Sequence, residues 1–277
     1  MISKLGRYGV LAVVSMVSWV SGCASDIGAQ DADIQGGVAE TQQAFSANWD
    51  YLWASTGHTF ANIGTSTNRT CFMSGLAGDL RPAGTTSQPG AGVRTNANGD
   101  YEIYVDSAGG ALSTYARCVN TATGRTPEVT WHTGDPAQWL GPVTSARRCF
   151  LTSVATSNAT ELSPGFKSNS DNVRVFQDST NWWLGGTQSG NAFARARCVD
   201  VSADLGGWLW VAGDPGARQD PLASNPGGAT CLLTGVGGHF TDSSDFSDGA
   251  YVSYSATASQ FYMNTKNGHS GWANCVQ

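Results

Sequence analysis

The sequence predicts an all-β protein made of three homologous units of about 75–80 residues, each closed by one disulfide. Long stretches with helical periodicity are absent, which argues against helices. The 35 glycines, together with many Ser, Thr and Asn residues, divide the chain into short segments, as strands joined by turns require. Finally, two cysteine-containing phrases each occur three times.

The first phrase begins at a cysteine that is followed by two large apolar residues and then Ser or Thr: CFMSGLAGDL from Cys71, CFLTSVATSN from Cys149 and CLLTGVGGHF from Cys231. The second ends near a cysteine: YARCV with Cys118, RARCV with Cys198 and WANCV with Cys275. Recurrence at intervals of about 80 residues identifies structural repeats. We therefore expect units at 45–119, 120–199 and 200–277.

Each unit owns one early and one late cysteine, so the economical pairing stays within the unit. It joins Cys71 with Cys118, Cys149 with Cys198, and Cys231 with Cys275. Bridges between neighbouring units are the alternative. The cysteines lack the spacing of zinc ligands, and we expect no metal and no cofactor. Units this small are near the lower limit for an independent core, so a disulfide in each would help them fold.

Three candidate strands, YEIYV from Tyr101, VRVF from Val173 and YVSY from Tyr251, are aligned as equivalents. Strand alternation then places their fourth-position aromatics, Tyr104, Phe176 and Tyr254, on the face opposite the core. The next segments, at 178–186 and 256–264, have only a short counterpart at 106–111, which predicts a trimmed first unit. The tryptophan that opens each unit (Trp53, Trp131, Trp210) is interpreted as structural.

Two architectures suit these units. They form either three beads in tandem or one body around a pseudo-threefold axis. Only about a dozen residues separate each closing cysteine from the tryptophan of the next unit, so we favour the compact arrangement.

The N-terminus is typical of an exported protein. Lys4 and Arg7 precede an apolar run, 9–20, that is too short for an ordinary membrane span, which predicts a signal peptide at 1–22. The phrase Val20-Ser21-Gly22-Cys23 resembles the lipobox of bacterial lipoproteins. That resemblance implies that Cys23, the odd seventh cysteine, receives lipid and becomes the first residue after cleavage. Residues 23–44 are then a flexible tether, and the residues after Cys23 imply the outer membrane, with the body periplasmic or surface-exposed.

The composition argues against several functions. The net charge of −6 without a cluster of Lys and Arg excludes nucleic acid as a partner. The chain has no H-E-x-x-H or G-x-S-x-G motif, and we expect no enzymatic activity. The acids considered for a hydrolytic pair, none favoured over the others, are Asp100, Glu102, Asp106, Asp171 and Asp178.

The adjacent Trp182 and Trp183 are the candidate ligand-binding residues, with Asn181 beside them. Neighbouring strand residues face opposite ways, so if one tryptophan packs inward the other is exposed or lies between units. An exposed one could stack on a sugar ring. The leading hypothesis is a lipid-anchored, non-enzymatic binding or adhesion module for glycans, whose repeated sites gain avidity. A structural or assembly component of the outer envelope that binds another envelope protein, and a secreted hydrolase, are the alternatives.

Overall fold

The computed structural model describes residues 49–54, 57–81, 88–107, 110–156, 165–210, 218–224, 229–240, 249–266 and 268–277. For 49–54, 208–210 and 218–224 it describes the backbone alone. The predicted signal peptide, Cys23 and the predicted tether lie outside these residues. Within them, no helix has the length and apolar character needed to cross a membrane.

Within the described residues, each unit contributes six strands. Unit one has β1 (Trp49–Ala54), β2 (Gly57–Thr65), β3 (Thr70–Gly78), β4 (Gly90–Thr95), β5 (Asp100–Ser107) and β6 (Leu112–Val119). Unit two has β7 (Val129–His132), β8 (Gln138–Pro142), β9 (Arg147–Thr156), β10 (Lys167–Gln177), β11 (Asn181–Thr187) and β12 (Ala192–Asp200). Unit three has β13 (Asp204–Trp210), β14 (Arg218–Ser224), β15 (Thr230–His239), β16 (Gly249–Ser255), β17 (Gln260–Thr265) and β18 (Ser270–Val276). The all-β prediction is confirmed.

The eighteen strands form three six-stranded antiparallel sheets, and every sheet combines halves of two units. Sheet 1 has the order β1-β6-β3-β16-β17-β14, sheet 2 has β7-β12-β9-β4-β5-β2, and sheet 3 has β13-β18-β15-β10-β11-β8. The first, sixth and third strands of a unit thus lie in one sheet, and its fourth, fifth and second strands lie in another. This cyclic exchange gives the described strands a threefold pattern and excludes separate tandem beads.

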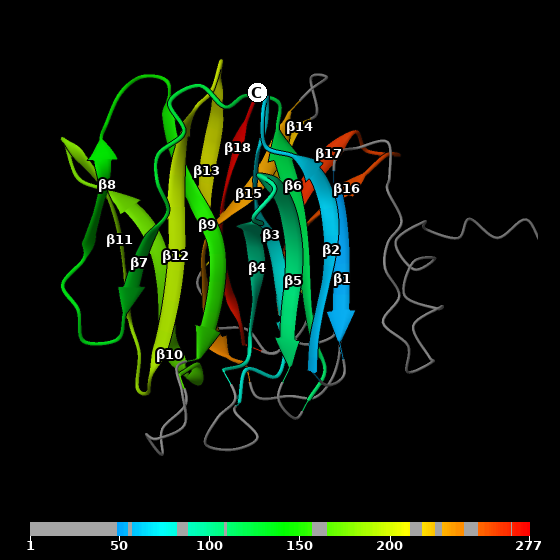
Figure 1. Cartoon of the computed structure of the whole chain (residues 1–277), viewed down its shortest axis with the longest axis vertical. Coiled ribbons are helices and arrows are strands. Elements are labelled where there is room, and N and C mark those ends of the chain that lie inside the picture. The colour runs from blue at the N-terminus through cyan, green and yellow to red at the C-terminus, as the bar shows by residue number, and fades with distance from the viewer. Residues whose placement is uncertain are drawn as a thin grey trace, which may run out of the picture. The chain divides into compact units, whose positions relative to one another are not determined.

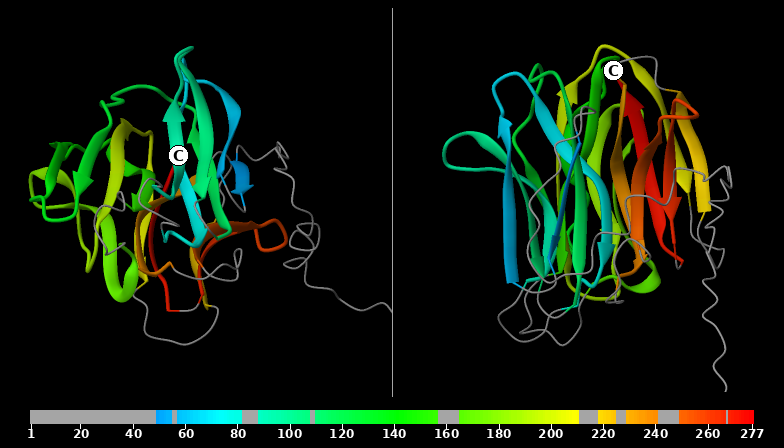
Figure 2. Two further views of the ribbon diagram at one scale, coloured as in Figure 1. Left: turned by 60° about the horizontal axis from the view of Figure 1, so that its bottom comes forward. Right: turned by 90° about the vertical axis from the view of Figure 1, so that its right-hand side faces the viewer.

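The third strands of the units, β3, β9 and β15, contact one another where the three sheets meet (Figure 1). Around them, the two halves of each unit face each other as a small sandwich, seen from two further directions in Figure 2. We call the face of a sheet that lines these sandwiches its inner face and the opposite one its outer face.

The disulfides join Cys71 with Cys118, Cys149 with Cys198, and Cys231 with Cys275, which confirms the predicted pairing. Each bridge links directly opposed residues of a unit's third and sixth strands. All six cysteines belong to the main core cluster. In a second cluster the three units meet through the residues after each cysteine: Phe72, Phe150 and Leu232, and Val119, Val199 and Val276.

The third strand of every unit carries a β-bulge at the Ser or Thr that lies three residues after its first cysteine. The residues are Ser74, Thr152 and Thr234, and each is skipped in the pairing with the sixth strand. A bulge shifts the alternation by one residue. The recurring Ser or Thr of the cysteine phrase therefore marks a backbone irregularity of the third strand, and Ser74 and Thr152 are buried there.

The predicted alignment of strands between units is wrong. Residues 101–105 lie in β5, a fifth strand, whereas Val173 and Tyr251 lie in the fourth strands β10 and β16. Unit one is therefore not trimmed, because β4 is its fourth strand. Phe176 lies on the outer face as expected, but Tyr254 packs against the core. The strand register makes Ala250, rather than Tyr251, the equivalent of Val173, so the alternation in β16 is shifted by one residue and Tyr254 points inward.

Where the third strand of one unit pairs with the fourth strand of its neighbour, glycine occurs in both of the outward-facing pairs that flank the buried pair Leu76–Ala250, Val154–Ala91 or Val236–Val173. The pairs are Gly75–Tyr251 and Ala77–Gly249 in sheet 1, Ser153–Gly92 and Ala155–Gly90 in sheet 2, and Gly235–Arg174 and Gly237–Asn172 in sheet 3. A Cβ added to any of these glycines would lie 2.9 Å or less from the Cβ of its partner. Opposed Cβ atoms in ordinary antiparallel pairs are about 4.5–5.5 Å apart. On the outer face of each sheet, the third and fourth strands therefore approach each other too closely for two opposed side chains.

The glycine of such a pair lies on the third strand in some cases and on the fourth strand in others. We therefore expect that it can be moved from one residue of a pair to the other with little loss of stability. We expect Gly90→Ala to destabilise the protein by about 1–3 kcal/mol, because its methyl group would overlap that of Ala155. Adding Ala155→Gly should restore most of this loss, since the glycine then sits on the third strand, as in sheet 3. Chemical denaturation of the single and double variants measures the coupling.

Gly207→Ala is the matched control, because its added Cβ would have no neighbour closer than 3.6 Å. We expect a change within about 0.5 kcal/mol. Purely additive effects of Gly90→Ala and Ala155→Gly would contradict the proposed crowding.

Candidate functional site

A row of three aromatic residues crosses the outer face of sheet 3. Phe176 of β10 pairs with Trp183 of β11, which pairs with Trp139 of β8. Directly opposed residues share a face, so the three side chains form one stripe. Trp139 is 55% exposed and Trp183 is partly exposed. A stripe of this kind is a candidate platform for a flat, partly apolar ligand.

Polar partners hold both indoles of the row. The Nε1 of Trp183 donates to the Asp178 carboxylate over 2.8 Å, and the Nε1 of Trp139 donates to the Asn181 Oδ1 over 2.9 Å. Asp178 also accepts from the backbone N–H groups of Thr180 and Asn181, each over 2.7 Å. The turn before β11 therefore positions the row.

Hydrogen bonds from the Thr180 backbone, the Trp183 indole and the Asn181 backbone lower the pKa of Asp178 to about 2. The carboxylate thus stays charged, and bonded to Trp183, at any pH well above that value.

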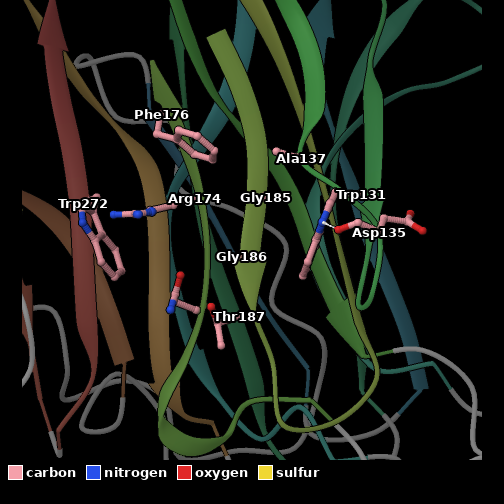
Figure 3. A pocket seen from close by; sticks show the side chains of 10 residues that line it. Trp131, Asp135, Ala137, Arg174, Phe176, Gly185, Gly186, Thr187 and Trp272 are labelled. Carbon is pink, nitrogen blue, oxygen red and sulfur yellow. Dashed lines mark hydrogen bonds between the residues drawn. The ribbon is translucent and has the colours of Figure 1, made fainter. Parts of the chain in front are cut away.

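A first hollow of about 330 Å³ adjoins the row (Figure 3). Arg174 extends across it toward Trp272 of β18, and Phe176 lies at one end. The Arg174 guanidinium carbon lies 5.5 Å from the centre of the Phe176 ring, and it forms no salt bridge with any described residue. Gly185 also lines this hollow, and a Cβ there would lie 3.3 Å from the Ala137 Cβ and 3.4 Å from the Phe176 ring.

A second hollow of about 420 Å³ lies on the other side of Phe176 and Trp272, which line both. Its wall includes Asn274 of β18, Trp182 of β11 and the bulge residue Thr234. Pairing of β10 with β15 ends at Arg174 and Gly235, so the two strands separate there. The hollow lies beyond that point.

The structure separates the candidates Trp182 and Trp183, as strand alternation predicts. Trp182 is 7% exposed within the main core cluster and borders the second hollow, while Trp183 lies on the outer face. Asn181 supports Trp139. Sequence reasoning missed Trp139, Arg174, Trp272 and Asn274, because only the pairing of β8 and β18 with their neighbours brings them to this face.

The acids that were considered for hydrolysis have separate partners. Asp100 accepts from Asn62, Glu102 pairs with Arg94, Asp106 pairs with His58, and Asp171 accepts from the backbone N–H groups of Lys167, Ser168 and Ser189. Across the described ranges, no three residues of His, Cys, Asp or Glu gather in a way that would hold a metal ion. Trp131 is buried, and its Nε1 donates to the carbonyl of Asp135. The side chains of Trp53 and Trp210 lie outside the described residues.

The aromatic row is confined to sheet 3. At the equivalent register of sheet 2, Arg94 pairs with Glu102, which pairs with Asn62. At that of sheet 1, Ser253 pairs with Tyr262, which pairs with Pro221. Three identical ligand sites are therefore absent from the outer faces that the structure describes.

Comparison of the chain with protein-family models, with curated proteins and with solved structures gave no match. The fold and the site define the class: a disulfide-linked, threefold-repeated all-β protein. One of its sheets carries the row of Phe176, Trp183 and Trp139 and the two hollows that adjoin Phe176, which we together call the groove.

From the low pKa of Asp178 we predict how the indole N–H resonance of Trp183 depends on pH. We expect its indole N–H resonance to keep its chemical shift from neutral pH down to about 3 and to move only as the pH falls through about 2, when protonation weakens the hydrogen bond. NMR of the indole N–H groups measures this. The Trp131 indole, bonded to a backbone carbonyl, should not respond, and a midpoint near 4 for Trp183 would contradict the expectation.

Proposed function

We propose that this protein is a lipid-anchored, non-enzymatic binding module of the bacterial outer envelope, and that its ligand is a glycan. The observation that supports the ligand class is the row of Phe176, Trp183 and Trp139 beside two hollows. Binding sites combine apolar and aromatic surface with a few placed polar groups, and this groove has both. Sugar rings present C–H faces that pack on aromatic rings and hydroxyl groups that need hydrogen-bond partners.

The single aromatic row changes how avidity would arise. Repeats within the chain do not supply several equal sites, since the matching rows of sheets 1 and 2 carry other residues. Many anchored copies on one membrane supply the multivalency instead, because a second contact to the same glycan surface becomes intramolecular.

The proposed anchor rests on the lipobox-like phrase at Cys23, and the three disulfides support the proposed export. Disulfides of this kind persist in oxidising compartments such as the periplasm and the cell surface. Acyl chains on Cys23 would hold the tether to the membrane, since each buried CH₂ contributes about 0.8 kcal/mol.

Glycan-array binding of the mature protein tests the ligand class. We expect Trp183→Ala and Trp139→Ala each to weaken binding at least about tenfold, or 1.4 kcal/mol, because each removes a ring of the platform. Phe60→Ala is the matched control: Phe60 is 51% exposed on sheet 2, and its loss should leave binding unchanged. Binding that is absent in the wild type, or that survives both tryptophan substitutions, would refute the proposal.

Mass spectrometry of the protein isolated from membranes tests the anchor. We expect a mature chain that begins at an acylated Cys23, and a Cys23→Ser variant that leaves the membrane fraction. An unmodified N-terminus at another residue would rule this anchor out.

A further inference from the structure

The second hollow occupies a position that an arginine fills in the other two sheets. The residue before the second cysteine of each unit is Arg117, Arg197 or Asn274, and the fifth strand in the same sheet supplies an aromatic residue at equivalent register: Phe261, Tyr101 or Trp182. The guanidinium carbon of Arg117 lies 4.9 Å from the Phe261 ring centre, and that of Arg197 lies 6.0 Å from the Tyr101 ring centre.

Sheet 3 has the shorter Asn274 at this position. Both Asn274 and Trp182 line the hollow of about 420 Å³. The hollow is therefore the space that Arg117, only 4% exposed, occupies in sheet 1. Replacement of arginine by asparagine in one unit out of three opens it.

Three polar atoms of the lining have no hydrogen-bond partner among the described residues. They are the Nε1 of Trp182, the Nε1 of Trp272 and the Oδ1 of Asn274. Trp182 is 7% exposed and Asn274 is 8% exposed. A buried polar group without a partner costs about 1–3 kcal/mol, so each of these atoms favours a ligand that satisfies it.

A salt bridge lies beside these atoms. Arg148 contacts Asp204 over 2.6 Å, and both line the hollow. Burial raises the pKa of Asp204, but hydrogen bonds from Arg148, the Gly206 backbone and the Asn274 side chain lower it overall. The carboxylate is therefore occupied by these donors, and the Asn274 Oδ1 is the acceptor left for a ligand.

Two N–H donors and one carbonyl acceptor match sugar hydroxyls, because a hydroxyl both accepts and donates hydrogen bonds. We propose that the hollow is a second subsite for the glycan, in which hydroxyls of one sugar residue accept from Trp182 and Trp272 and donate to Asn274. This inference rests on the proposed function and names the ligand as an oligosaccharide. The chain would run along Trp139 and Trp183, pass Phe176 and end in the hollow.

The structure offers a substitution that fills the subsite with the residue of the other units. Asn274→Arg should place a guanidinium over Trp182, as Arg117 lies over Phe261, and the fold already accepts arginine there twice. The probes are the disaccharide and the hexasaccharide of the sugar series that the array binds best. We expect at least tenfold weaker binding of the hexasaccharide and less than about a twofold change for the disaccharide, which covers the aromatic row alone.

Asn98→Arg, which adds the same charge in an exposed turn, is the control and should bind as the wild type does. The hexasaccharide should also shift the indole N–H resonances of Trp182 and Trp272, whereas the disaccharide should not. Unchanged hexasaccharide binding by Asn274→Arg, together with lost binding by Trp183→Ala, would overturn the subsite and leave the proposed function standing. A wild type that binds no glycan would overturn both.

Discussion

The threefold arrangement depends on close approach between the third strand of one unit and the fourth strand of the next. At that junction the two outward pairs that flank the central buried pair each contain a glycine, and no added Cβ would find room. None of these six glycines has a positive φ, so space rather than backbone conformation requires them. Because the pair needs only one glycine, either strand can carry it, and the sequence pattern of the junction differs between the three sheets.

Core and surface differ in how closely the units resemble one another. Cysteines, the residues that follow them and the bulge residues keep equivalent places in all three units, because each contributes to packing or to the path of the backbone. Away from the glycine-containing pairs, residues on the outer faces of the sheets are not constrained in this way. One sheet presents an aromatic row, a second presents ion pairs such as Arg94 with Glu102, and a third pairs Tyr115 with Tyr251 at a ring distance of 5.8 Å. The three units therefore share one scaffold, whereas the aromatic row belongs to one sheet alone.

Much of the fold could be predicted from the sequence, because cysteine spacing and repeated phrases are local signals. The disulfides and the all-β class followed from them, and strand alternation predicted that Trp182 and Trp183 face opposite ways and that Phe176 faces outward. Strand exchange could not be predicted, since it depends on pairing between units, and the error in aligning 101–105 with Val173 and Tyr251 has the same origin. The groove was missed for a related reason: Trp139, Arg174 and Trp272 are far apart in the chain and meet only across β8, β10 and β18.

Strand exchange also has a consequence for biogenesis. Sheet 1 joins β1, β6 and β3 near the start of the body to β14, β16 and β17 near its end, so it cannot be completed before the C-terminal residues are present. A partly translocated chain would expose the unpaired edge of β3 and the apolar residues behind it, which is a state prone to aggregation. The export that we propose would therefore require the incomplete chain to be protected from aggregation, or to be translocated quickly, until its last strands are present.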